Sequence, residues 1–239
     1  VYDAGHILGS LQFRFEKFSS SIVYTGDLNL VDTLITRAGE IVECDELIID
    51  ATYGNPRIIF PDRWSVYEDL SGFVDSCVKV GKPPVFKAYT VGKAQEIIAL
   101  INGFLGMEVL VDSRIARVNE VYRFAGVDLN YISLASDDGK DAFKSMSLPL
   151  VTSNHDVFRV ASSMGMVKAL ATGWSILYSF PNYDASFPLS SHADFNQLVS
   201  YIERAKPSRV YPVGHYARDL STWLRKNMSL YSIPLDDLA

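Results

Sequence analysis

The chain has 239 residues, of which 48% are hydrophobic and 21% are charged, as in a folded protein with one large core or two modest cores. No stretch approaches the roughly 18 consecutive apolar residues of a membrane span and no secretory leader opens the chain, so we expect a soluble cytoplasmic protein with no membrane partner. The net charge of −6 argues against a broad basic nucleic-acid-binding face, but it leaves a nuclease open, because carboxylates around metal ions can coexist with a local basic groove.

The first elements of the chain are expected to form a hairpin. Apolar and polar side chains alternate over residues 11–16, which is the period-two pattern of a half-buried strand. The serines at 19–21 predict a turn, and residues 21–25 predict a second strand. The two strands should therefore pair as neighbours in one sheet.

Two carboxylates follow strands at their C-terminal ends. The predicted strand 21–25 runs into Asp27, and the apolar run 47–49 ends in Asp50. A Gly-Asp pair is by itself a turn signal, which is the alternative reading of Asp27. An acid after an apolar strand, however, must find a cation, a metal or hydrogen-bond donors, and such edges of α/β sheets commonly hold active sites.

The middle of the chain has a different pattern. From about residue 63 to residue 173, helices and strands alternate, which predicts a separate α/β unit. Helical spacing covers residues 67–78 and 94–101, and apolar runs predict strands at 85–86, 107–111 and 127–134. After about residue 174 we expect a strand over 174–180, a helix over 193–205 and a strand over 209–213.

The cysteines indicate neither a metal site nor a disulfide framework. Cys44 and Cys77 lie in apolar segments without CxxC or zinc-knuckle spacing. Free cysteines of this kind behave as small apolar side chains, so we expect buried free thiols.

Among the four histidines, His6 and His192 lie in short segments rich in Gly, Asp and Ser. His6 is bracketed by two glycines, as in a ligand loop, although an imidazole in a turn is also satisfied by one backbone hydrogen bond. His192 precedes the predicted helix 193–205, which Ser190 or Ser191 could cap. A helix N-terminus attracts phosphate but disfavours imidazolium, so His192 as a general acid would need a carboxylate partner.

Five segments in this order resemble the β-CASP branch of the metallo-β-lactamase superfamily, namely residues 3–10, 24–29, 50–54, 92–96 and 190–195. The resemblance extends to about Lys226. Within that branch, the chain is similar most of all to the mRNA 3′-end-processing-like and DNA-ligase-associated exonucleases. It implies an α/β fold with a metallo-β-lactamase αββα sandwich, of which the C-terminal portion occupies residues 1–62 and 174–239, and an inserted β-CASP α/β domain at 63–173.

The resemblance also implies roles for four residues. His6 matches a zinc ligand, and Asp27 matches the carboxylate shared by two Zn²⁺ ions. Asp50 matches the acid that orients a histidine, and His192 matches that histidine, which would protonate the leaving oxygen. Such an arrangement would supply the carboxylate partner that a histidine at a helix start requires.

Three further residues complete the comparison. Lys93 matches a cation of the inserted domain that would contact the nucleic-acid backbone, and Ser191 would contact nucleic acid beside His192. A solvated surface charge is the alternative for Lys93. His155 matches no catalytic motif, so we expect it to be structural.

The sequence departs from the branch at its N-terminal end. The His-x-His-x-Asp-His motif that carries most of the family's metal ligands does not occur, and the chain begins with Val1 instead of methionine. We therefore expect sequence upstream of Val1 to be missing. His6 and Asp27 cannot supply two zinc ions, each of which needs about three protein ligands, so the chain as given should be inactive.

A second departure lies in the last motif. Family members related to RNA processing usually read Val-His-Gly there, whereas this chain reads Val213, Gly214, His215. We expect His215 to be the remaining zinc ligand, with Gly214 at positive φ turning it towards the metals. The alternative is a histidine that caps or packs beside the helix starting near Ala217.

The function expected of the whole protein is hydrolysis of phosphodiester bonds by a zinc-dependent nuclease. RNA is slightly favoured over single-stranded DNA, because a histidine in the last motif is more similar to the RNA-processing members. One alternative is a non-catalytic relative that binds RNA or a partner subunit. Another is a small-ester or thioester hydrolase, against which the Gly-Lys-Ala-Gln-Glu segment argues. The sequence leaves open exo- or endonuclease action, polarity and the oligomeric state, a homodimer included.

Overall fold

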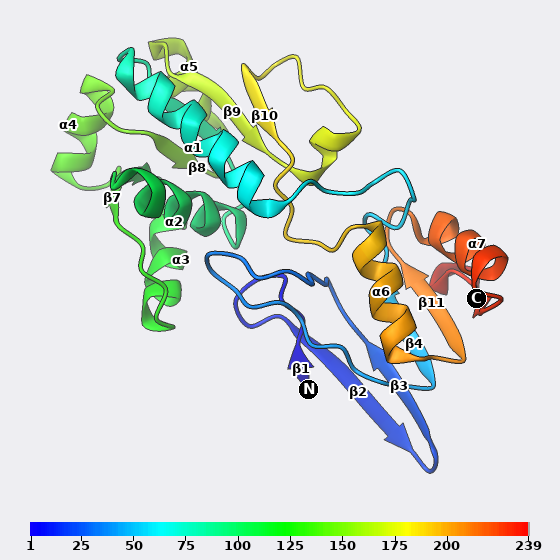
Figure 1. Ribbon diagram of the computed structural model, residues 1–239. Helices are drawn as coiled ribbons and strands as arrows, with labels where there is room; N and C mark the ends of the chain where they lie inside the picture. The colour runs from blue at the N-terminus through cyan, green and yellow to red at the C-terminus, as the bar shows by residue number, and fades with distance from the viewer. Residues whose placement is uncertain (239) are drawn as a thin grey trace. The chain divides into compact units, whose positions relative to one another are not determined.

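The structure is a computed structural model in which residues 1–238 are described. The chain forms two α/β units (Figure 1). The first unit contains Val1–Phe60 and the residues from Ser191 onward, and the second unit contains Pro61–Ser190. Each unit is built around its own six-stranded sheet. The expected α/β class is thereby confirmed.

The sheet of the first unit has the strand order β1-β2-β3-β4-β11-β12. Neighbours are antiparallel from β1 to β3 and parallel from β3 to β12. The expected hairpin is β2–β3, with its turn at Phe18 and Ser19. The strands are β1 (Tyr2–Asp3), β2 (Leu11–Lys17), β3 (Ser20–Tyr24), β4 (Glu46–Asp50), β11 (Arg209–Val213) and β12 (Tyr231–Ser232).

Helices α6 (Phe195–Ala205) and α7 (Ala217–Asn227) cover one face of this sheet (Figure 1). The buried residues of α6 recur at helical spacing, which places a single apolar stripe against the strands. Side chains of α6 and α7 share one core with Leu47 and Ile49 of β4 and Val210 of β11. A short 3₁₀ helix, η2 (Leu235–Leu238), ends the described chain.

The opposite face of the hairpin is exposed and apolar. Phe13 and Phe15 on β2 and Ile22 and Tyr24 on β3 are all exposed, Phe15 to 62%. The buried member of β2 is instead Gln12, whose side-chain amide donates to Asp3 O and Glu40 O and whose Oε1 accepts from Tyr201 Oη. The strand was correctly expected, but it is not half-buried, because within β2 only Gln12 is buried. The hydrogen bonds of Gln12 compensate the burial of its amide.

The sheet of the second unit has the order β10-β9-β5-β8-β6-β7, and all its neighbouring strands are parallel. Parallel strands need crossover connections, which helices supply in the alternation that the sequence predicts. The strands are β5 (Pro84–Lys87), β6 (Val109–Val111), β7 (Tyr131–Ser133), β8 (Leu150–Thr152), β9 (Val167–Ala171) and β10 (Ala185–Phe187).

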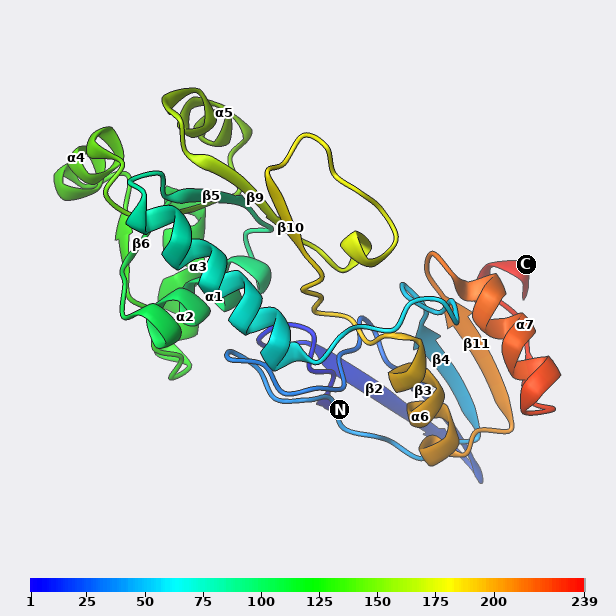
Figure 2. The ribbon, with the colours of Figure 1, turned by 45° about the horizontal axis from the view of Figure 1, so that its top comes forward.

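Helices cover both faces of this second sheet (Figure 2). Val85 of β5 belongs to a core with α4 and α5, whereas the next residue, Phe86, contacts Phe73 of α1 edge-on. Successive side chains of a strand point to opposite faces, so α1 and α5 lie on different sides. The helices are α1 (Arg63–Lys79), α2 (Lys93–Leu105), α3 (Ser113–Phe124), α4 (Asp137–Ser145) and α5 (His155–Met164).

The segment after β9 differs from the prediction. Residues 174–180, expected as a strand, contain the 3₁₀ helix η1 (Gly173–Ile176), which Thr172 caps by accepting from Trp174 N. The chain does not return to the first unit at residue 174 as expected. It stays in the second unit through Ser190, because β10 pairs with β9 and extends the parallel sheet. The first boundary, expected after residue 62, falls after Phe60.

The remaining general expectations concern thiols and membranes. Cys44 is buried, Cys77 is half-buried, and both are free, as expected except for the partial exposure of Cys77. Across the described residues, none of the helices has the length and apolarity that a membrane crossing requires.

Candidate metal centre

His6 lies on a loop between β1 and β2 whose position depends on Gly5. Gly5 has a φ of +75°, and a Cβ on it would lie 2.4 Å from Asn29 O and 2.5 Å from Gly39 N. Only glycine fits so close to two backbone segments. Asn29 Nδ2 donates to Gly5 O, and Asn29 N donates to Ala4 O. The loop is therefore fixed against the segment that follows β3, which carries Asp27.

Asp27 and Asp50 come from neighbouring parallel strands. Asp50 ends β4 and Asp27 follows β3, and the two strands are held in register by Thr25 N donating to Ile48 O and by Asp50 N donating to Thr25 Oγ1. Their carboxyl ends meet at one edge of the sheet, as the sequence predicts.

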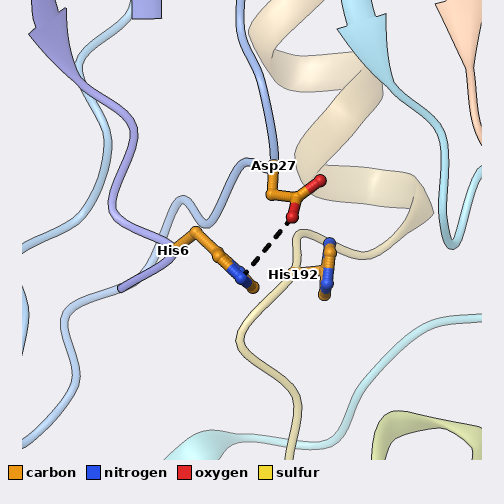
Figure 3. Close-up of side chains that lie close together, drawn as sticks. All are labelled: His6, Asp27 and His192. Carbon is orange, nitrogen blue, oxygen red and sulfur yellow. Dashed lines mark ion pairs between the residues drawn. The ribbon is translucent and has the colours of Figure 1, made fainter. Parts of the chain in front are cut away.

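Three side chains converge at this edge (Figure 3). Ligand atoms of His6, Asp27 and His192 all lie within 4.8 Å of one another. His6 Nε2 is 3.6 Å from Asp27 Oδ2, and the two imidazole rings are 4.4 Å apart between centroids. His6 Nδ1 donates to Ser191 O at 2.7 Å, which fixes the ring and leaves Nε2 as the nitrogen that faces Asp27.

The expected pair of Asp50 and His192 is present. His192 Nδ1 donates to Asp50 Oδ2 at 2.8 Å. Asp50 is only 7% exposed, and its other oxygen accepts from Thr52 N at 2.8 Å and from Thr52 Oγ1 at 2.6 Å. Burial raises the pKa of Asp50, but the hydrogen bonds from His192 and Thr52 outweigh burial and hold it below its usual value. Asp50 is thus an ionised anchor that orients His192.

Thr52 is a contributor that the sequence interpretation missed. Its hydroxyl and its backbone N–H both donate to the carboxylate two residues earlier. The signal for it was present, because an Asp side chain commonly accepts from the backbone N–H two residues later in the chain.

The pKa of His6 is lowered. Burial and the neighbouring His192 lower it, against the opposing effects of Ser191 O, Asp27 and Asp50. A lowered pKa favours the neutral imidazole, which is the form that binds metals.

The group fits one divalent ion better than two. A carboxylate and two imidazoles are the donor types that zinc takes at catalytic sites, where about three protein ligands hold each ion. Within residues 1–238, this is the group of three or more donors that could hold a metal. Two ions would require further donors, so the residues present fit part of a two-metal centre.

His215 does not join this group. Gly214 has the expected positive φ, +115°. The turn is nevertheless held by Tyr216 N donating to Ala51 O and by Ala217 N donating to Gly214 O, so it leads directly into α7. His215 is exposed and its ring packs edge-on against Tyr216 at 4.7 Å between centroids. His215 therefore lies outside the group of His6, Asp27 and His192 and packs beside the start of α7, and its role as a zinc ligand stays a prediction.

Lys93 is buried, contrary to both interpretations of the sequence. Its Nζ donates to Leu189 O at 2.8 Å and lies 3.8 Å from Glu96 Oε2. Burial lowers the pKa of Lys93 to about 8, against the attraction of Glu96. Arg63 and Tyr67 also bond to Glu96, so Lys93 belongs to an internal ion network of the second unit. The sequence position of Lys93 at a helix start did not reveal this burial.

The remaining predicted residues contribute no side chain to the group of His6, Asp27 and His192. Ser191 accepts from His6 through its carbonyl oxygen. Neither Ser190 nor Ser191 caps α6. The cap is Asp194, which accepts from Gln197 N and Phe60 N. His155 begins α5 and is exposed, outside the group of His6, Asp27 and His192.

Two imidazoles and a carboxylate that converge at a sheet edge, with one imidazole held by a buried second carboxylate, are typical of metal-dependent hydrolases.

No family model matches the chain. A probable DNA ligase from Opitutus terrae is 27% identical over 95% of this chain and 22% of that protein. An RNase J-like protein from Methanocaldococcus jannaschii is 26% identical over 87% of this chain and 61% of that protein.

A third relative is transcription termination factor FttA from a Lokiarchaeum species, 28% identical over 65% of this chain and 26% of that protein. The chain thus spans between 22% and 61% of the lengths of these curated relatives. The chain is a relative of the β-CASP nucleases of the metallo-β-lactamase superfamily, as its motifs predict.

Proposed function

We propose that this chain forms part of a zinc-dependent nuclease that hydrolyses phosphodiester bonds. In this proposal the first unit is the C-terminal portion of a metallo-β-lactamase sandwich and the second unit is the inserted β-CASP domain. The observation that carries the proposal is the pair of buried Asp50 and half-buried His192 beside His6 and Asp27. This group combines metal donors with a proton donor.

Each residue has one task in this reaction. His6 and Asp27 hold the metal ion. When bound, the ion supplies an activated water and stabilises negative charge on the phosphate. Asp50 accepts from His192 Nδ1 and so directs the opposite nitrogen, Nε2, towards the leaving oxygen, which it protonates. The two carboxylates differ in environment: Asp50 is buried and Asp27 is exposed, ready for a ligand.

The first test is metal binding by the 239-residue chain. We expect it to hold zinc weakly and to cleave nothing, because His6 and Asp27 alone cannot complete two zinc shells. Calorimetric titration with Zn²⁺ should show weak binding that His6→Ala and Asp27→Ala remove. His215→Ala is the matched control, since that exposed histidine lies outside the group. Two tightly held ions after dialysis against a chelator would contradict the ligand assignment.

The second test uses the complete protein that contains this chain. Asp27→Ala should abolish both metal binding and cleavage. His192→Ala should keep the metal and lower the cleavage rate by about 10²–10⁴-fold, the usual contribution of a general acid. Loss of metal in His192→Ala would make this histidine a ligand instead.

We propose RNA as the preferred substrate. The sequence argument from His215 no longer supports this preference, because that residue lies outside the group. Support comes instead from the relatives that are named as RNases. The relative that is named as a probable DNA ligase argues against the preference. Cleavage of matched single-stranded RNA and DNA oligonucleotides by the complete protein tests it, and faster DNA cleavage would refute it.

A non-catalytic relative is the second candidate. The position of His215 outside the group of His6, Asp27 and His192 favours it, as does the absence of the His-x-His-x-Asp-His motif from the given sequence. Such a protein would bind RNA equally well with and without the Asp27→Ala substitution. The complete protein would also cleave neither RNA nor DNA when Zn²⁺ is supplied.

A further inference from the structure

The second unit contains an open cavity of about 630 Å³ that the proposed metal centre does not use. It lies at the carboxyl ends of three neighbouring strands: Lys87 ends β5, Ser153 follows β8 and Thr172 follows β9. The chain leaves β5 for α2, which packs against α1, and leaves β8 for α5 on the other face. Where the loops after neighbouring strands run to opposite faces of a parallel sheet, they leave a crevice between them, and open parallel sheets commonly bind ligands in such a crevice.

Aromatic rings line this cavity: Tyr89, Trp174, Tyr178 and Phe180. Tyr89 is 80% exposed and Tyr178 is 52% exposed, and the rings of Trp174 and Tyr178 are 6.2 Å apart between centroids. Exposed rings gathered in a hollow are uncommon on a surface that binds nothing. Their flat faces suit a ligand that is itself flat and aromatic.

One cation extends into the same cavity. Lys87 is half-buried and its Nζ donates to Ser153 O, which leaves further N–H groups of the ammonium for a ligand. Arg114 and Asp112 are the other charged groups near it. The Asp112 carboxylate is engaged by hydroxyl and backbone donors, among them Thr152 Oγ1 and Ser153 N, so the Lys87 ammonium keeps N–H groups available for a ligand in the cavity.

We propose that this cavity binds an unpaired nucleotide of a single-stranded nucleic acid, with its base stacked on Trp174 or Tyr178 and its phosphate against Lys87. Proteins commonly bind single strands by combining aromatic side chains, which stack on the bases, with cations that contact the nucleic-acid backbone. Paired bases are already stacked inside a duplex, so a duplex does not enter. The identity of the ligand rests on the proposed nuclease function.

Binding by the 239-residue chain tests the proposal directly. The probe is a fluorescein-labelled single-stranded RNA of about eight nucleotides, within the usual site size, measured by anisotropy in EDTA so that no cleavage occurs. Trp174→Ala and Tyr178→Ala should each weaken binding about tenfold. Phe124→Ala is the matched control, because that ring is 94% exposed on α3 outside the cavity. It should leave the affinity unchanged.

Two further measurements separate ligand contact from loss of structure. Lys87→Gln should reduce the slope of log affinity against log salt by about 0.7, the contribution of one phosphate contact on a single strand. The RNA should also quench tryptophan fluorescence in the wild type and in Trp64→Phe but not in Trp174→Phe, a variant that keeps an aromatic ring in place. Circular dichroism checks the fold of each variant.

The outcomes distinguish this proposal from the nuclease proposal. Two outcomes would refute the cavity as the binding site. One is that Trp174→Phe keeps both the wild-type affinity and the full fluorescence quenching. The other is that RNA binds with equal affinity to Trp174→Ala, Tyr178→Ala and Phe124→Ala. A wild-type chain that binds no single strand at all would also refute it. Neither result affects the metal and cleavage tests, which depend on Asp27 and His192. Conversely, RNA held in the cavity by a complete protein that cleaves nothing would refute the nuclease alone.

Discussion

Gly5 is the residue on which the position of His6 depends most. A methyl group on Gly5 would overlap Asn29 O and Gly39 N and would also sit at positive φ, so Gly5→Ala should destabilise the protein by more than about 2 kcal/mol. Zinc binding should fall with it, because the loop must move. Gly9→Ala is the matched control, since Gly9 has a φ of +81° but an added Cβ meets nothing within 4 Å. It should cost about 1 kcal/mol and spare zinc binding, as calorimetry and chemical denaturation can show.

His6, Asp27, Asp50 and His192 could be recognised from sequence because short fixed motifs at strand and helix ends determine where they lie. The structure brings all four together. His215 and Lys93 could not be placed in the same way. The direction of His215 depends on a turn that is held by Tyr216 N donating to Ala51 O. The burial of Lys93 depends on its hydrogen bond to Leu189 O, which is 96 residues away in sequence. Long-range contacts of this kind leave no local pattern.

Asp112 connects two elements of the second unit. Its side chain caps α3 by accepting from Arg114 N and Ile115 N, and it accepts from Thr152 Oγ1 and Ser153 N beyond the neighbouring strand β8. Asp112→Asn replaces an acceptor oxygen by a donor that faces other donors. We expect a loss of about 2–4 kcal/mol in the free energy of unfolding. Asp156→Asn, at an exposed ion pair on α5, should change it by less than about 0.5 kcal/mol.

The same carboxylate gives a pH dependence with a defined sign. Burial raises the pKa of Asp112, but its hydrogen bonds outweigh burial and leave it below its ordinary value of 3.8. A depressed pKa stabilises the fold above that ordinary value, and the stabilisation is lost as the pH falls below it. The stability of the wild type should therefore fall more steeply than that of Asp112→Asn between about pH 5 and pH 2 in denaturation experiments. Parallel acid limbs would contradict this role.

At the level of elements, periodicity predicted α1, α2 and α6 and several strands, including β11 with its observed bounds, but it gave no individual prediction for α3, α4 and α5. It failed over residues 174–180, where apolar and aromatic residues suggested a strand. Those side chains instead surround a 3₁₀ turn and an open cavity. Composition alone does not separate a buried strand from an aromatic loop that lines a cavity.

In the whole molecule, the two units have different connectivity. Residues 61–190 are one continuous segment with a complete parallel sheet covered by helices on both faces, whereas the first unit is assembled from two separated segments. We expect residues 61–190 expressed alone to fold, because each domain-sized segment with its own core can do so. Circular dichroism and a cooperative thermal transition test this. An unfolded segment would show that its core depends on the rest of the chain.

The exposed face of the β2–β3 hairpin governs how the isolated chain behaves at high concentration. Phe13 lies opposite Tyr24 and Phe15 lies opposite Ile22, so four apolar side chains form one contiguous patch on a flat antiparallel ribbon. Patches of this kind promote association between copies, against which a net charge of −6 gives only weak repulsion. We expect the chain to bind hydrophobic dyes and to scatter more light as concentration rises. Phe15→Lys should suppress both effects without lowering the melting temperature, because the face it alters is in water.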